Sequence, residues 1–253
     1  MKILITGGAG YIGATIASAC IDAGVEPIIL DDFSTGLPEY VAGRVSYRGD
    51  IRDGQIIDLI MREHPGIHAV IHCAAKIVVP ESVTDPLSYY ATNVGGTIDL
   101  LPHLRRNGVG RVGFSSSASV YAAEEGEGVD ENSRLRPASP YARTKAMIET
   151  VLDDAAQAGL VRAMSLRYFN PIGADPALRT GPTAPNPTHV LGLLMKAANE
   201  GATFTITGTD WATRDGSGLR DFIHVWDLAV AHVRAVQRFD DVVTPDKPHV
   251  VLN

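Results

Sequence analysis

Cysteine is scarce in this sequence. The 253 residues include only Cys20 and Cys73, and neither lies at a spacing typical of metal ligands. So few cysteines favour a reducing compartment over a disulfide-stabilised one, and we predict a cytoplasmic protein without a metal site. We interpret each cysteine as a small buried apolar residue rather than as a nucleophile.

Positive charge and long apolar runs are also in short supply. The chain has 22 Lys and Arg against 29 Asp and Glu, which gives a formal net charge of −7. An acidic chain without a basic tail binds nucleic acid and anionic membranes poorly. No apolar run is long enough to cross a bilayer, and the glycines in the N-terminal apolar stretch favour a strand and a turn over a signal peptide. We therefore expect neither a nucleic-acid partner nor a membrane partner.

The sequence does contain a regular alternation of strand and helix patterns. Strands are predicted at 2–6, 27–30, 45–47, 69–72, 112–115 and 163–167. Amphipathic helices are predicted at 11–23, 53–63, 86–105 and 140–157. Strands that alternate with helices at this spacing predict an α/β protein with a doubly wound parallel sheet, the Rossmann arrangement. The strands are apolar without alternation, as expected when both faces of a sheet are covered.

The pattern changes after Tyr168. Five prolines between 170 and 189 indicate a long loop, followed by a helix at 190–200, a strand at 203–207, a polar loop at 208–218, a helix at 226–238 and a last strand at 250–253. We predict a cofactor-binding domain at 1–169, on which the helix at 226–238 packs back. Residues 170–253 are predicted to form a smaller substrate lobe.

The first predicted turn is rich in glycine. Gly7, Gly10 and Gly13 follow the first strand and open the first helix. Glycine lets a pyrophosphate approach the backbone, and the helix N-terminus supplies free N–H groups. Asp31, after the second strand, can accept hydrogen bonds from an adenosine ribose and would repel a 2′-phosphate, which favours NAD over NADP. Asp32 could share this role; the alternative is a structural turn with a capping aspartate.

Tyr141 and Lys145 lie four residues apart on one face of a predicted helix. A nearby ammonium can lower the pKa of a tyrosine, which could then act as a general base. Ser117 ends a serine run after a predicted parallel strand, where ligands of open α/β sheets bind. Taken alone, the pair could equally be an exposed helix pair, and the serine run could be polar turn chemistry.

These motifs occur together in a known order. They are followed by Arg167-Tyr168-Phe169-Asn170 and by Arg220-Asp221-Phe222-Ile223-His224-Val225, and preceded by Pro80-Glu81-Ser82-Val83 and by Tyr89-Tyr90 with Asn93-Val94. The chain thereby resembles the extended short-chain dehydrogenases/reductases over its whole length. Within them it is most similar to the UDP-glucose 4-epimerases.

The resemblance implies a set of site residues. Tyr141 would be the base, Lys145 would hold the nicotinamide ribose, and Ser117 would orient a sugar hydroxyl. The predicted NAD site comprises Gly7, Gly10, Tyr11, Ile12, Gly13, Asp31, Asp32, Asp50, Ile51, Ala74, Ala75, Asn93, Tyr141, Lys145 and Phe169. The predicted UDP-sugar site comprises Ser117, Tyr141, Asn170, Thr188, His189, Thr205, Thr207, Arg220 and Phe222.

The sequence departs from the family pattern in three places. Ile77 stands where a lysine is common, and Ala122 replaces the usual glycine after Tyr121. Family members also continue for several tens of residues beyond 253, so we expect an incomplete substrate lobe.

The resemblance implies NAD-dependent epimerisation at C4 of a UDP-hexose through a 4-keto sugar, in a homodimer. The segment 115–121 carries no carboxylate, which argues against a dehydratase. Another nucleotide-sugar epimerase or dehydratase, or a catalytically silent NAD-binding protein, remains the alternative.

We expect a dimer interface on the helices at 86–105 and 140–157, because their apolar positions exceed what one sheet face needs: Leu100, Leu101, Leu104, Ile148, Val151 and Leu152.

Overall fold

The computed structural model describes the 253 residues except 122–127, 184–186, 188 and 207. Its centre is a sheet of seven parallel strands in the order β3-β2-β1-β4-β5-β6-β9. The strands are β1 Lys2–Thr6, β2 Glu26–Asp31, β3 Val45–Arg48, β4 Ile67–His72, β5 Arg111–Ser115, β6 Arg162–Leu166 and β9 His249–Leu252. The strand order reverses direction between β1 and β4, so the prediction of a doubly wound α/β fold is confirmed.

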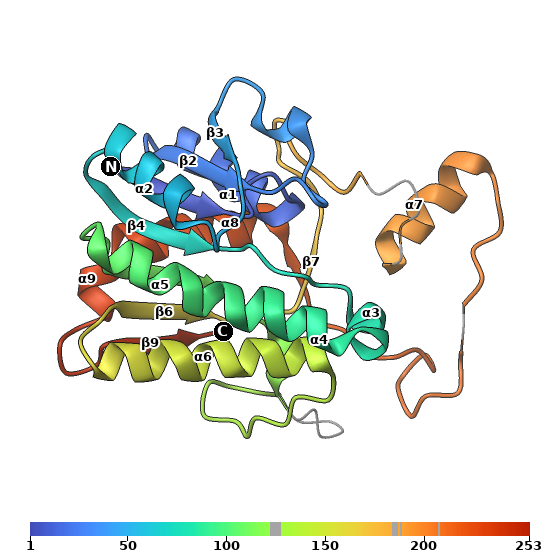
Figure 1. The fold of residues 1–253 in the computed structure, drawn as a ribbon. Coiled ribbons are helices and arrows are strands. Elements are labelled where there is room, and N and C mark those ends of the chain that lie inside the picture. The colour runs from blue at the N-terminus through green and yellow to red at the C-terminus, as the bar shows by residue number, and fades with distance from the viewer. Residues whose placement is uncertain (122–127, 184–186, 188, 207) are drawn as a thin grey trace.

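Helices cover both faces of this sheet (Figure 1). On one side, α2 (Gly54–Glu63), α5 (Gly96–Arg106) and α6 (Pro140–Gln157) pack on residues such as Leu4. On the other side, α1 (Tyr11–Asp22) and α8 (Val225–Gln237) pack on Ile3 and Ile5. Successive strand residues face opposite sides, and burial on both sides explains why the strands are apolar throughout.

The expected dimer helices bury their apolar residues within the chain. Leu100, Leu104, Ile148 and Leu152 are at most 1% exposed, and they belong to the cluster that packs on the sheet. Leu101 is in the same cluster and Val151 packs against it. The argument that these positions exceed the needs of one sheet face is therefore wrong, because the sheet and α2 cover them.

The helical region between β4 and β5 is divided into more elements than predicted. In place of one helix at 86–105, the chain forms α3 (Val79–Thr84), α4 (Pro86–Tyr89), a π-helical stretch η2 (Tyr90–Gly95) and then α5. The η2 stretch widens the helix by one residue per turn, which is often a feature of functional sites. Two short 3₁₀ helices, η1 (Pro38–Val41) and η3 (Ala118–Val120), and a short helix α9 (Phe239–Val242) complete the helical elements of the sheet region.

The C-terminal third differs from the sequence prediction in two places. The stretch 170–172, predicted as loop, is strand β7 (Asn170–Ile172), which pairs in parallel with β8 (Phe222–His224). The strand predicted at 203–207 is not formed over 203–206, where exposed Ile206 lies on irregular backbone; residue 207 lies outside the described residues. No partner strand meets 203–206 in the described part of the chain, and a lone strand cannot satisfy its backbone.

After β8 the chain returns to the main sheet. Helix α8 packs on α1, and β9 pairs with β6 at the sheet edge. By contrast, α7 (Val190–Glu200) has no buried residue and stands off to one side in Figure 1. The division into domains at residue 170 stays a prediction.

Candidate functional site

The glycine-rich turn between β1 and α1 is packed too closely for side chains. Gly7 has a φ of +71°, and a Cβ placed on it would lie 2.6 Å from the backbone nitrogen of Ala74. A Cβ on Gly13 would lie 2.2 Å from the carbonyl oxygen of Gly7. Both glycines are therefore required by close backbone approach, and Gly7 also by its left-handed backbone.

The N-terminus of α1 suits an anion. Gly10 is the N-cap and has no side chain to accept hydrogen bonds from the first-turn amides, and the first turn, which starts at Tyr11 and Ile12, has no acidic residue. The positive end of the helix dipole and its amides are thus left for a ligand such as a pyrophosphate. These features fit the phosphates of NAD.

Asp31, at the end of β2, is tied to the glycine turn. One carboxylate oxygen accepts a hydrogen bond from the Ala9 amide at 2.9 Å, and the other accepts from the Phe33 amide at 2.8 Å. Asp31 is 8% exposed, and burial raises the pKa of its carboxyl although both amides act to lower it. Asp32 is exposed and accepts hydrogen bonds from Ser34. Asp31, rather than Asp32, therefore has the fixed position that ribose recognition needs.

Other residues predicted to line NAD end neighbouring strands. Ala74 and Ala75 follow β4, and Asp50 and Ile51 follow β3. Asp50 accepts three hydrogen bonds from the Arg52 guanidinium, which hold the pKa of the Asp50 carboxyl below its usual range. Because carboxyl ends of parallel strands share one edge, the fold brings these segments to the edge that holds the glycine turn.

Asn93 is fully buried inside η2 and ties two segments together. Its side-chain oxygen accepts from the Lys76 amide at 2.8 Å, and its NH2 donates to the Lys76 carbonyl and to the Thr144 hydroxyl, both at 3.0 Å. Thr144 donates in turn to the carbonyl of Tyr141 at 2.7 Å. Asn93 thus fixes the loop after β4 against the helix that carries Tyr141.

A second set of buried hydrogen bonds extends this network to the glycine turn. Thr6 lies 2.7 Å from His72 Nδ1, and His72 Nε2 lies 3.0 Å from the Thr97 hydroxyl. Thr97 donates its only hydroxyl hydrogen to the carbonyl of Asn93, so His72 must donate through Nε2 and accept from Thr6 through Nδ1. Burial lowers the pKa of His72 to about 3, which agrees with this neutral form. This network is not visible in the sequence, because its members come from four separate elements.

The three serines at the end of β5 have different partners. Ser115 lies 2.7 Å from the hydroxyl of Tyr168, and Ser116 donates to Glu149 at 2.5 Å. Ser117 is the N-cap of η3, and its hydroxyl lies 2.9 Å from that of Ser119. Ser117 is only half-buried, whereas Ser115 and Ser116 are buried. Among the three, Ser117 is therefore the one whose hydroxyl is least enclosed by the protein.

Lys145 is 2% exposed and lies one turn after Tyr141 on α6. Its Nζ donates to the Ser115 carbonyl at 2.7 Å and lies 5.8 Å from the centre of the Tyr141 ring. Burial lowers the pKa of Lys145 to about 8, while it raises the pKa of Tyr141. The net direction for Tyr141 is opposite to the prediction that Lys145 would lower it, because desolvation of the phenolate outweighs the other contributions in the protein alone.

A buried ion pair between Arg167 and Glu149 lies against Ser116. Arg167 and Glu149 are about equally buried, and the guanidinium makes hydrogen bonds of 2.6 and 3.0 Å to the carboxylate. Arg167 also donates to the hydroxyl of Tyr121 at 2.8 Å, and the Tyr121 hydroxyl donates to the Asn253 side chain at 2.7 Å. Sequence analysis did not identify this pair, which holds Ser116 and hence the backbone that leads to Ser117.

The residues predicted for the UDP-sugar site are only partly brought together. The β7–β8 pairing places Asn170 opposite Phe222, and the Asn170 side chain donates to the Asp221 carbonyl at 2.8 Å. Phe169 packs beside the small cluster of Ala118, Val120 and Tyr121. Arg220 is exposed, His189 is the exposed N-cap of α7, and Thr205 is exposed on irregular backbone. Thr188 and Thr207 lie outside the described residues.

The fold and this constellation define a dinucleotide-binding α/β protein with a Ser-Tyr-Lys set at the carboxyl edge of its sheet. Residues 3–251 match the profile of the NAD dependent epimerase/dehydratase family, and the chain belongs to this family. It is 44% identical to a UDP-glucose 4-epimerase of Azospirillum brasilense over 237 residues, which are 93% of this chain and 68% of that protein.

Two solved structures show the same fold. A UDP-glucose 4-epimerase from Stenotrophomonas maltophila, with bound NAD and formylated UDP-arabinopyranose, superposes with a TM-score of 0.92 at 35% identity, covering 100% of this chain and 77% of that one. A UDP-glucose 4-epimerase from Brucella ovis in complex with NAD superposes with a TM-score of 0.91 at 37% identity, covering 100% of this chain and 76% of that one. The predicted family resemblance is confirmed. No described helix is both long and apolar enough to cross a membrane.

Proposed function

We propose that this chain catalyses NAD-dependent epimerisation at C4 of a UDP-hexose, which interconverts UDP-glucose and UDP-galactose through a 4-keto sugar. The observation that carries the proposal is the pair on α6: buried Lys145 lies one turn after Tyr141, with its Nζ 5.8 Å from the centre of the Tyr141 ring. The relatives named UDP-glucose 4-epimerase, and the neighbour that holds both NAD and a UDP-sugar, support it.

The three members of the set act together in proton transfer. Tyr141 accepts the proton of the sugar 4-hydroxyl and later gives it back. Ser117 orients that hydroxyl, and Lys145 places a positive charge near the phenol. Because burial raises the pKa of Tyr141, this charge is needed to favour the phenolate during proton transfer. Bound NAD supplies the hydride acceptor and donor.

The glycine turn, Asp31 and the ends of β3 and β4 form the proposed NAD site. Asp31 would accept from the adenosine ribose, and the α1 amides would hold the pyrophosphate. Lys145 would also contact the nicotinamide ribose, and Phe169 would flank the nicotinamide. For the UDP-sugar we propose Asn170, Thr188, His189, Thr205, Thr207, Arg220 and Phe222.

We also propose a cytoplasmic homodimer. Helices α5 and α6 keep apolar side chains on their outer sides, with Ile98 49% exposed and Met147 45% exposed. A second copy would cover them. Light scattering of the purified chain at micromolar concentration, with Ile98→Glu as a disrupting variant, tests this arrangement; a monomeric wild type contradicts it.

Turnover of UDP-galactose to UDP-glucose by the purified, NAD-loaded chain tests the activity. Tyr141→Phe should lower kcat by about 100-fold or more, the usual scale for loss of a general acid/base. Tyr47→Phe is the matched control, since the Tyr47 hydroxyl contacts Glu63 and His64 on the protein surface. Absence of wild-type turnover with NAD bound, or full turnover in Tyr141→Phe, contradicts the proposal.

A further inference from the structure

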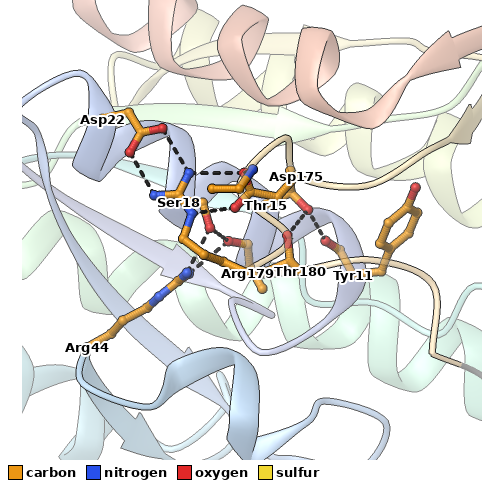
Figure 2. Close-up of polar contacts among 10 residues, drawn as sticks. Tyr11, Thr15, Ser18, Asp22, Arg44, Asp175, Arg179 and Thr180 are labelled. Carbon is orange, nitrogen blue, oxygen red and sulfur yellow. Dashed lines mark hydrogen bonds and ion pairs between the residues drawn. The ribbon is translucent and has the colours of Figure 1, made fainter.

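Residues 173–181 run along helix α1 and bind it at several points (Figure 2). At the start of the helix, the Tyr11 hydroxyl donates to the Gly173 carbonyl at 2.6 Å. One turn later the hydroxyls of Thr15 and Thr180 lie 2.8 Å apart. We call residues 173–181 the clasp. It follows directly after β7 and so connects the proposed substrate side with the helix of the glycine turn.

The clasp is held in shape by its own buried carboxylate. Asp175 is 1% exposed and accepts from the Ala177 amide at 2.9 Å and from Arg179 at 2.5 Å. Its backbone N–H donates to the Thr180 carbonyl at 3.0 Å, which closes the turn. Thr180 is 3% exposed. A segment with this many internal bonds is pre-organised, so little ordering is needed for it to bind α1.

Arg179 fastens the clasp to the far end of α1. Two of its nitrogens contact the two carboxylate oxygens of Asp22, the last residue of the helix, at 2.7 and 2.8 Å. The guanidinium also lies 5.7 Å from the ring centre of Trp226, the second residue of α8. The same group pairs with Asp175, so one arginine joins the clasp, α1 and α8. A two-point arginine pair within a charge network is the kind of surface ion pair that contributes measurably.

Arg44 contacts the same face of α1 as the clasp, since Ser18 lies in line with Thr15 and Asp22. Arg44 donates to the Ala14 carbonyl at 2.9 Å and to the Ser18 hydroxyl at 2.7 Å. Tyr40 of η1 donates to the Gly181 carbonyl and accepts from the Gly181 amide, which ties the end of the clasp to the segment after β2. The clasp therefore spans α1 from Tyr11 to Asp22 and is anchored at both of its own ends.

We propose that Arg179 and Asp22 are positioning residues for cofactor retention: by fastening the clasp along α1, they hold the pyrophosphate-binding end of that helix in place and slow the release of NAD. The inference rests on the proposed function for the identity of the ligand. Neither residue touches the glycine turn. Their effect passes through the clasp to Gly173, whose carbonyl binds Tyr11 at the first turn of α1.

The dissociation rate of NAD from the holoenzyme, measured without sugar by competition with excess labelled NAD, tests the inference. Asp22→Ala should raise this rate about threefold, within the range expected for an exposed ion pair, and Arg179→Met about tenfold, because it also leaves the buried Asp175 carboxylate without its partner. Arg179→Lys should fall between Met and wild type, because lysine cannot make the two-point contact. Hydrogen exchange should quicken in 173–181 and in the first turn of α1.

Asp240→Ala is the matched control. Asp240 also pairs with arginines, at 2.9 Å to Arg111 and 2.5 Å to Arg162, and its side chain is 50% exposed against 47% for Asp22. It lies beside β5 and β6, away from α1. Asp240→Ala should leave the dissociation rate of NAD within twofold of wild type.

Three results would overturn the inference: an unchanged rate in Arg179→Met, an equal rise in Asp240→Ala, or faster release without faster exchange in the clasp. A wild type that holds NAD but does not turn over UDP-galactose would contradict the proposed function alone. A wild type that does not retain NAD would contradict both.

Discussion

The side-chain amide of Asn93 donates to the Thr144 hydroxyl at 3.0 Å, so η2 and the helix that carries Tyr141 share one buried hydrogen bond. The Thr144 hydroxyl in turn donates to the Tyr141 carbonyl at 2.7 Å. The position of the proposed base is thereby set by a residue predicted to line NAD.

Replacement of Thr144 by valine tests this coupling. Valine has nearly the same shape but leaves one buried N–H of Asn93 unpaired, which should cost about 1–3 kcal/mol of folding free energy. We expect kcat for UDP-galactose to fall about tenfold, which corresponds to ~1.4 kcal/mol in the barrier, with little change in NAD affinity. Thr144→Ser should restore turnover. A loss of stability with wild-type kcat would show that the bond is only structural.

Asp31→Ala should weaken NAD binding and relax discrimination against NADP, because the carboxylate that accepts from the ribose and repels a 2′-phosphate is removed. Asp32→Ala is the control, since Asp32 is exposed and bonds only to Ser34 among the contacts described. Titration of both variants with NAD and NADP measures the preference. An unchanged preference in Asp31→Ala would remove this residue from the site.

Acid should destabilise the protein through two buried histidines. Burial lowers the pKa of His72 to about 3 and that of His232 to about 4, from an ordinary 6.5. Below pH 6.5 the unfolded chain binds protons that the folded chain does not, so stability is fully present above this pH and falls as pH drops toward 4. The slope should approach ~1.4 kcal/mol per pH unit for each histidine.

Urea unfolding between pH 7 and pH 4.5 measures that slope. His232→Gln should reduce it, because the buried imidazole whose pKa is lowered is removed. Equal slopes in wild type and His232→Gln would contradict the assignment.

Arg167→Met should destabilise the fold by about 3–5 kcal/mol, because it leaves the Glu149 carboxylate buried without its partner. The double variant Arg167→Met, Glu149→Leu should recover most of this loss, since no unpaired charge remains. Urea unfolding of the wild type, the single variant and the double variant measures these free energies. A double variant no more stable than the single one would show that the pair contributes more than it costs to bury.

The sequence by itself determined the sheet, the glycine turn and the Tyr141–Lys145 pair. Those features are local: apolar runs form strands, the glycine spacing follows from close backbone approach, and residues four apart share a helix face. The chain order of strands and helices also determined the doubly wound topology, because parallel strands need crossovers.

The tertiary structure alone decided which polar groups meet. It paired β7 with β8, left 203–206 without a partner, and turned Leu100 and Leu104 toward the sheet rather than toward a second copy. It also left Ser117, among three adjacent serines, only half-buried, and brought Arg179 to Asp22 across 157 positions of sequence. Such contacts depend on how separate elements pack together. The hydrophobic periodicity of one segment predicts its own secondary structure but not which other segment it contacts.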